Sequence, residues 1–294
     1  MRVALITNPR AGRNAGIVAA TKADDVFRTA GWQAVRQLTR APGDATRLAR
    51  RAAEQGFAAV LACGGDGTLS QVLTGLLDTG IPGGMIPAGT GNDFARTIGL
   101  SRDPAAAARQ LVNGHSRDID LLQINDGAFW SVNVIGVGFD AAVAARINRR
   151  RRLTGGLLAY LTAVAQELWH YRPTELRLRV DDQQWVGPAL LLAVANAQSY
   201  GAGMKIAPAA VIDDGRLDVV LVQHIGRLEF IRSFPRVLRG THVDHPAVRM
   251  WKGTEATIET PEPSPVLVDG DVQCNTPVHV CVSPARAKLW MPGA

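Results

Sequence analysis

Cysteine is scarce in this sequence. The three cysteines are Cys63, Cys274 and Cys281, and their spacing matches no zinc or redox motif. A disulfide-stabilised scaffold is therefore excluded, and we expect the chain to work in a reducing compartment.

Long apolar runs are also missing. The longest candidate, residues 188–197, has the length of a strand, whereas a helix that spans a bilayer needs about 20 apolar residues. The apolar part of the first residues is too short for a signal peptide. We therefore expect a cytoplasmic protein that does not span a membrane.

Aromatic residues make up only 5% of the chain, and no nucleic-acid-binding motif is present. This combination argues against a nucleic-acid partner, because single strands are bound on stacked aromatic rings. The G-x-x-x-x-G-K-[ST] motif is absent too, which excludes a P-loop enzyme. The net charge is nevertheless +6, with a pI near 9.7. This balance favours phosphorylated substrates or an anionic lipid surface.

The most informative stretch that is present reads CGGDGTLSQ, residues 63–71. An apolar run, residues 57–62, precedes it, and leucines at helical spacing follow it. The glycines therefore lie on a turn from a strand to a helix, where ligand phosphates can approach the backbone and the helix N-terminus. Asp66 would repel phosphate unless a metal intervenes, which points to Mg²⁺-assisted chemistry. A plain glycine-rich turn with Asp66 as a helix cap is the alternative.

Strands alternate with helices over the first ~120 residues, which predicts a parallel sheet with helical crossovers. Three turns follow strands, at Asn8, Gly64 and Gly89. They can converge at one sheet edge, where such folds bind ligands. Residues 122–283 instead read as short strands separated by turns, which predicts a mostly antiparallel β domain. Its expected strands include 129–137, 184–186 and 190–195, and its expected helices cover about 155–170 and 227–238. Residues 284–294 are expected to return to the first domain, residues 1–121.

Several motifs together resemble the diacylglycerol kinase catalytic family, which includes bacterial lipid kinases and sphingosine kinases. They cover nearly the whole chain in order: Asn8-Pro9-x-Ala11-Gly12, Gly64–Thr68, Pro87–Arg96, Gly136–Ala141, Asn196 with Tyr200–Met204, and Asp213-Asp214-Gly215. GGDGT alone also occurs in NAD kinases, so the full series carries the specificity.

The resemblance implies a two-domain fold with a nucleotide-binding α/β domain, a β-sandwich-like domain and an active site in the cleft between them. It implies ATP- and Mg²⁺-dependent phosphorylation of a lipid hydroxyl, most simply of diacylglycerol. By position, the family's nucleotide contacts fall on Asn8, Pro9, Arg10, Ala11, Gly12, Thr39, Gly65, Asp66, Gly67, Thr68, Leu69, Ser70, Gln71 and Thr90. Arg13 falls where a basic residue would assist the phosphates.

Three acidic residues fall on positions at the reaction centre, namely Asp66, Asp93 and Asp271. Where the family has Asp-Gly-Glu with a catalytic base, this chain has Asp269-Gly270-Asp271. Asp271 is shorter by one C–C bond, roughly 1.5 Å, and a displacement near 1 Å can cost about 100-fold in rate. Asp271 is thus a repositioned base, or the enzyme is slow or inactive. An exposed residue of a hairpin turn is the simpler interpretation.

A structural metal loop of the family falls on Asp214 and on the backbone carbonyls of Val211 and Arg216. Without the resemblance, Asp213-Asp214-Gly215 reads as a β-turn.

A lipid kinase must meet a bilayer. The arginine-rich residues 146–152 precede an apolar helix, and Arg227, Arg232, Arg236 and Arg239 interleave with apolar residues. We therefore expect peripheral contact with the anionic inner face of a membrane. A solvated basic helix face is the alternative, and a homodimer is left open.

Two other functions compete with a lipid kinase. One is an NAD kinase-like enzyme, against which the Asn8-Pro9 turn and the Gly136 and Asp213 stretches argue. The other is a nucleotide-binding regulatory protein that lost catalysis through the change at Asp271.

Overall fold

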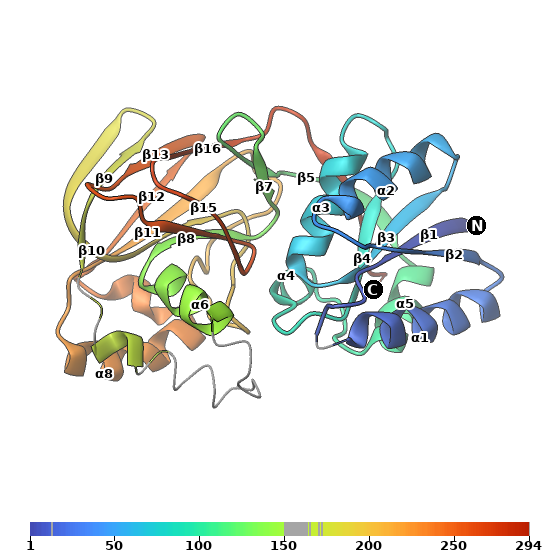
Figure 1. Cartoon of the computed structure of the whole chain (residues 1–294), viewed down its shortest axis with the longest axis horizontal. Helices are drawn as coiled ribbons and strands as arrows, with labels where there is room; N and C mark the ends of the chain where they lie inside the picture. The colour runs from blue at the N-terminus through green and yellow to red at the C-terminus, as the bar shows by residue number, and fades with distance from the viewer. Residues whose placement is uncertain (13, 150–163, 165, 170, 172, 294) are drawn as a thin grey trace.

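The computed structural model describes residues 1–12, 14–149, 164, 166–169, 171 and 173–293 of the chain. It has two sheets, each covered by helices (Figure 1). The first sheet and its helices form an α/β domain. The second sheet is antiparallel and belongs to a β-sandwich-like domain. Both agree with the prediction from the sequence. Arg13 and most of the expected helix at 155–170 lie outside the described residues.

The first sheet has six strands in the order β2-β1-β3-β4-β17-β5. Neighbouring strands are parallel except β17 and β5, which confirms the predicted parallel sheet. Every residue of β3 is buried, as expected of a parallel strand covered on both faces. The bounds are β1 (Arg2–Thr7), β2 (Gln33–Leu38), β3 (Ala59–Gly64), β4 (Gly83–Pro87), β5 (His115–Ile119) and β17 (Ala287–Met291).

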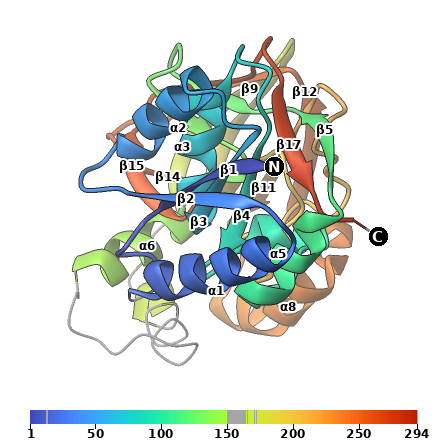
Figure 2. The ribbon, with the colours of Figure 1, turned by 90° about the vertical axis from the view of Figure 1, so that its right-hand side faces the viewer.

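Helices cover both faces of this sheet (Figure 2). Helix α1 (Ala15–Thr29) packs against α5 (Pro104–Val112) on one face. Helix α2 (Asp44–Glu54) packs against α3 (Asp66–Leu76) on the other. Small buried residues let the helices approach closely, because a Cβ on Gly75 would lie 2.3 Å from the carbonyl oxygen of Thr46. A short helix, α4 (Asp93–Thr97), follows the Gly89 turn.

The second sheet has eleven strands and runs β15-β14-β8-β10-β9-β13-β16-β6-β7, with β11 and β12 branching from β10. Its neighbouring strands pair antiparallel, as predicted. The bounds are β6 (Leu122–Ile124), β7 (Phe129–Ser131), β8 (Val134–Gly138), β9 (Thr174–Val180), β10 (Gln183–Ala195), β11 (Leu217–Gln223), β12 (Val248–Gly253), β13 (Glu255–Glu259), β14 (Pro265–Val268), β15 (Asp271–Asn275) and β16 (Val278–Val282).

Two strand predictions in this sheet were wrong. The expected strands 184–186 and 190–195 are the single strand β10, which pairs with β9 over its first half and with β8 over its second. Proline usually interrupts a strand. Pro188 nevertheless lies inside β10, at the point where the strand changes partners, and pairs in register with Glu175. The expected strand 129–137 is two strands, because Val132 and Asn133 donate their N–H groups to the Asp269 carboxylate.

Helices α6 (Phe139–Arg149) and α8 (Arg227–Arg239) lie on the same side of the second sheet (Figure 1), and the 3₁₀ turn η1 (Thr241–Asp244) follows α8. Within the described residues, no helix is both long and apolar enough to cross a bilayer.

The chain crosses between the sheets twice. It leaves the first sheet between β5 and β6 and returns between β16 and β17. The two crossings are joined by a hydrogen bond from the Ser283 N–H to the Leu121 carbonyl, 2.8 Å long. They position the Gly-rich turns of the first sheet against strands of the second.

Candidate active site

The three glycine-containing turns meet at the carboxyl ends of β1, β3 and β4. A Cβ on Gly89 would lie 2.6 Å from the Cα of Gly65, and one on Gly12 would lie 2.0 Å from the carbonyl oxygen of Ala88. Real Cβ atoms do not approach so closely, so these contacts require glycine. The expected convergence of the turns is confirmed. It places backbone N–H groups and the N-terminus of α3 at one edge of the sheet.

The Asn8 turn is fastened to the start of α3. The Asn8 side chain accepts a hydrogen bond from the Arg10 N–H (3.0 Å) and donates one to the Thr68 hydroxyl (3.4 Å). The Thr39 N–H donates to the carbonyl of Thr7 at the end of β1 (3.0 Å). Residues of three different segments are thereby held at the same edge.

The predicted nucleotide contacts fall into two groups. The first group retains exposure to solvent and comprises Asn8, Pro9, Arg10, Ala11, Gly12, Thr39, Gly65, Gly67, Gln71 and Thr90. The second group is buried and comprises Asp66, Thr68, Leu69 and Ser70. Leu69 is fully buried in the core, and the buried Ser70 hydroxyl donates to the carbonyl of Trp130 on β7 (2.9 Å). Leu69 and Ser70 therefore face inward with their side chains, and Ser70 joins α3 to the second sheet.

A cavity of about 470 Å³ adjoins these turns. Gly12 and Thr90 line it together with the cationic side chains Lys22 and Arg102.

Asp66 caps a neighbouring helix. One carboxylate oxygen accepts the N–H of Asp93 (3.0 Å) and the other accepts the N–H of Phe94 (3.1 Å), both in the first turn of α4. Burial raises the pKa of Asp66 to about 7, and the two hydrogen bonds only partly offset this effect. The carboxylate thus positions the Gly89–Phe94 segment against the Gly-rich turn.

Asp93 connects the two halves of the molecule. Its carboxylate lies 2.5 Å from the Arg96 guanidinium and accepts the N–H of Ala202 at 2.8 Å. Ala202 has a φ of 71° and belongs to the Tyr200–Met204 motif of the second half. The buried side chain of Asp93 is therefore engaged in holding that loop against α4.

Asp271 faces the Gly-rich turn from the second sheet. It is the first residue of β15 and is exposed, and its Oδ2 atom lies 3.8 Å from the position a Cβ on Gly67 would take. The surrounding protein shields it partly from water and raises its pKa. Its side chain accepts no hydrogen bond from the part of the chain that the structure describes.

Asp269 holds the turn that carries Asp271, a role that the sequence did not predict. The buried Asp269 carboxylate accepts hydrogen bonds from the Ser131 hydroxyl (2.6 Å) and from the N–H groups of Val132, Asn133 and Val134 (3.1–3.3 Å). These bonds fasten the β14–β15 turn to the β7–β8 connection. The Asp-Gly-Asp motif draws attention to Asp269, but the residues that donate to its carboxylate are more than 130 positions away in the sequence.

The side chains present allow a test of the predicted magnesium ion. Within the described residues, no group of three or more His, Cys, Asp or Glu side chains could hold a metal. Each carboxylate oxygen of Asp66 accepts one hydrogen bond and keeps a second lone pair, so Asp66 could still hold Mg²⁺ directly or through water. Mg²⁺ bound by one carboxylate and substrate phosphates fits this arrangement, because Mg²⁺ rarely needs an all-protein cage.

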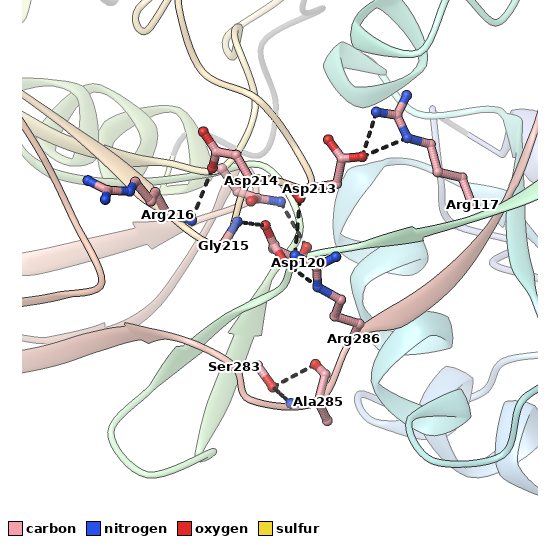
Figure 3. A network of polar contacts seen from close by, with 10 residues as sticks. Arg117, Asp120, Asp213, Asp214, Gly215, Arg216, Ser283, Ala285 and Arg286 are labelled. Carbon is pink, nitrogen blue, oxygen red and sulfur yellow. Dashed lines mark hydrogen bonds and ion pairs between the residues drawn. The ribbon is translucent and has the colours of Figure 1, made fainter.

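The predicted metal loop lies beside Asp120 and Arg286, where the chain crosses between the sheets (Figure 3). The Asp214 carboxylate lies 2.6 Å from the Lys252 ammonium on β12 and accepts the Arg216 N–H at 3.0 Å. The ammonium also lies 3.7 Å from Asp218. A fixed cation thus lies at Asp214, which the sequence predicts to hold a metal together with the backbone carbonyls of Val211 and Arg216. The metal loop stays a prediction.

An apolar pocket lies between α6, α8 and strands β10 and β11. Phe139, Leu191, Val222, Phe230 and Phe234 are among its lining residues. The rings of Phe139 and Phe230 pack edge to face, with centroids 5.3 Å apart. Asp140 also lines the pocket, and burial raises its pKa to about 6.

Comparisons with known proteins cover nearly the whole chain. Residues 2–124 match the family model of the diacylglycerol kinase catalytic domain, and residues 133–291 match that of the YegS C-terminal NAD kinase beta sandwich-like domain. The chain is 36% identical over 99% of its length to a diacylglycerol kinase of Mycobacterium tuberculosis, with 95% of that protein covered. It is 32% identical to the diacylglycerol kinase of Bacillus subtilis, over 92% of this chain and 89% of that protein.

A solved structure has the same fold. The crystal structure of a diacylglycerol kinase from Bacillus anthracis superposes with a TM-score of 0.75, covering 99% of this chain and 96% of that one. At 24% sequence identity this likeness concerns the fold.

Proposed function

The chain belongs to the diacylglycerol kinase family of lipid kinases, and from this premise we propose that it transfers the γ-phosphate of ATP to diacylglycerol, which yields phosphatidic acid. A lipid kinase needs a phosphate-binding turn, a base for the hydroxyl and a place for acyl chains. The described residues offer a candidate for each of these.

The observation that carries the proposal is the approach of Asp271 to Gly67. The carboxylate of the second sheet lies 3.8 Å from a Cβ position on the turn of the first sheet. A hydroxyl placed between them would have a proton acceptor on one side and the phosphate-binding turn on the other. Catalysis of phosphoryl transfer consists mostly of such positioning and of charge stabilisation.

In the proposed reaction, backbone N–H groups of the turns and the N-terminus of α3 hold the phosphates of ATP. The lipid hydroxyl oxygen bonds to the γ-phosphorus, the bond from that phosphorus to the β-bridging oxygen breaks, and ADP leaves. Asp271 accepts the hydroxyl proton, and its raised pKa makes it a stronger base than an ordinary aspartate. Mg²⁺, held through Asp66 and the phosphates, would offset the charge on the transferred group.

The apolar pocket supports a lipid as the acceptor. Most of its wall consists of aromatic and aliphatic side chains, several of them from α6, α8, β10 and β11. Burial of an acyl chain there would contribute roughly 0.8 kcal/mol per CH₂ group. A small polar acceptor would leave this pocket without use.

The first test measures transfer of radiolabelled γ-phosphate from ATP with Mg²⁺ to a panel of lipid alcohols, with NAD beside them. We expect diacylglycerol to be labelled. Asp271→Asn should reduce the rate about 100-fold or more, because general-base catalysis contributes factors of that size. Asp271→Glu should retain activity, since it keeps the carboxylate.

Asp126→Asn is the matched control, because Asp126 is an exposed aspartate in the β6–β7 turn. It should leave the rate unchanged. Labelling of NAD instead of lipid would overturn the proposal in favour of an NAD kinase. ATP binding without transfer to any acceptor would favour the regulatory alternative. Full activity in Asp271→Asn would keep the kinase and exclude Asp271 as the base.

A further inference from the structure

Helix α8 has apolar residues on two different sides. On the inner side, Phe230, Phe234 and Val237 line the apolar pocket. On the outer side, Leu228 is 71% exposed, Ile231 56% and Leu238 51%. The outer residues follow the i, i+3, i+10 positions of one helical stripe, and no residue of α8 is buried. Water-exposed apolar side chains aligned along a helix mark a surface that another phase or molecule covers.

Trp169 extends this stripe at the start of α8. Its ring is 66% exposed and lies under the Arg227 guanidinium, whose Cζ atom is 5.0 Å from the ring centroid. Arg227 also donates to the carbonyl oxygens of Leu168 (3.3 Å) and Trp169 (2.8 Å). The tryptophan is therefore held beside the helix. Tryptophan is enriched where a protein meets the interface of a bilayer.

The outer side is also basic. Arg232, Arg236 and Arg239 are exposed beside the apolar stripe. Glu229, the acidic residue of α8, lies 3.3 Å from His245. A helix with aligned apolar residues and flanking arginines suits an anionic membrane surface, where the apolar side enters the interface and the cations contact lipid phosphates.

We propose that the outer side of α8, with Trp169, docks on an anionic lipid bilayer. This inference rests on the proposed function, because a kinase whose substrate is a membrane lipid must reach the bilayer surface. The position of α8 favours a bilayer over a protein partner, because the same helix forms part of the wall of the pocket proposed for the acyl chain. Docking would place that pocket next to the lipid phase.

The test uses the full chain and vesicles of phosphatidylcholine with or without phosphatidylglycerol, separated by sedimentation. We expect binding to require phosphatidylglycerol and to weaken as salt rises. Leu228→Ser combined with Ile231→Ser should reduce the partition coefficient about tenfold or more, through lost apolar burial. Arg232→Gln combined with Arg236→Gln should reduce it by a similar factor and lower its salt dependence.

Matched controls are Val186→Ser, an apolar residue of β10 that is 57% exposed, and Arg50→Gln combined with Arg51→Gln on α2. They should bind vesicles as the native chain does. All the substituted residues are exposed, so thermal unfolding should confirm intact folds.

Activity separates this inference from the proposed function. The α8 variants should phosphorylate a water-dispersed short-chain diacylglycerol at the native rate and lose activity on diacylglycerol in vesicles. Failure of the native chain to phosphorylate any diacylglycerol would refute the proposed function, whatever the vesicle binding. If the α8 variants bind vesicles as strongly as the native chain does, the proposed docking surface is wrong. A native dimer that the α8 variants dissociate, with unchanged vesicle binding, would assign the face to a second copy instead.

Discussion

Asp140 shows how burial at a single residue controls stability. It lies in the wall of the apolar pocket, where burial raises its pKa from 3.8 to about 6 while hydrogen bonds with Ala141 and Tyr200 partly offset the effect. The folded chain therefore holds a proton at Asp140 that the unfolded chain has released. Between pH 4 and pH 6, the contribution of Asp140 to stability falls as pH rises, by up to about 1.4 kcal/mol per pH unit.

Asp140→Asn tests this effect, because the amide stays neutral at all these pH values. Between about pH 4 and pH 6 the native chain should lose stability relative to Asp140→Asn as pH rises. Denaturant unfolding at several pH values measures it. Asp182→Asn, at an exposed aspartate in the β9–β10 turn, should keep the native pH dependence. An identical pH profile for native chain and Asp140→Asn would contradict the assignment.

At the scale of an element, the loop before β11 shows a side chain in a role otherwise given to a metal. The ammonium of Lys252 on β12 contacts the carboxylates of Asp214 and Asp218. Its hydrogen bond with Asp214 raises the pKa of the lysine above the ordinary value. Lysine is attached to the strand that pairs with β11, so this cation is present whenever the sheet forms. The ammonium thus offsets one of the two negative charges at this place without a metal.

We expect the thermal unfolding of the native chain to be unchanged by EDTA or by added Mg²⁺. Lys252→Met should lower the free energy of unfolding by about 1–3 kcal/mol, since two carboxylates lose their partner. Added Mg²⁺ should restore part of this loss.

Lys288→Met serves as the control, because Lys288 forms an exposed pair with Asp118 at 3.3 Å and such pairs contribute little. If chelation destabilises the native chain as much as the Lys252→Met substitution does, the loop holds a metal after all.

At the scale of the whole molecule, one polar network joins the sheets where the chain crosses between them (Figure 3). The buried Asp120 carboxylate accepts the Gly215 N–H at 2.6 Å and lies 3.3 Å from the Arg286 guanidinium. Arg286 also donates to the carbonyl of Asp213 (3.1 Å), whose carboxylate binds Arg117. Both crossings and the loop before β11 are thus tied together.

Arg286→Leu should loosen this junction. The buried Asp120 would lose its cationic partner, so we expect the free energy of unfolding to fall by about 1–3 kcal/mol. Hydrogen exchange should speed up at residues 119–122 and 283–287. Arg117→Leu removes a more exposed pair and should have the smaller effect. Equal effects of the two substitutions would show that the junction does not depend on Asp120.

The sequence alone predicted the features that depend on neighbouring residues. The run before Gly64 and the leucines after it predict a strand and a helix, because burial periodicity is a local signal. The order of the glycine motifs identified the family, because close backbone contacts demand glycine at those positions. The parallel first sheet followed from alternating elements. Short segments such as α4, β5 and β12 carried no such pattern and were not predicted.

The roles of the acidic residues were decided by the tertiary structure. Asp66 accepts from a backbone 27 residues away, Asp93 from one 109 away, and Asp269 from a hydroxyl 138 away. A motif cannot show which carboxylate is occupied by such partners and which stays free. Only the pairing of strands from both sheets brings Asp271 to Gly67, because that contact joins residues from opposite ends of the chain.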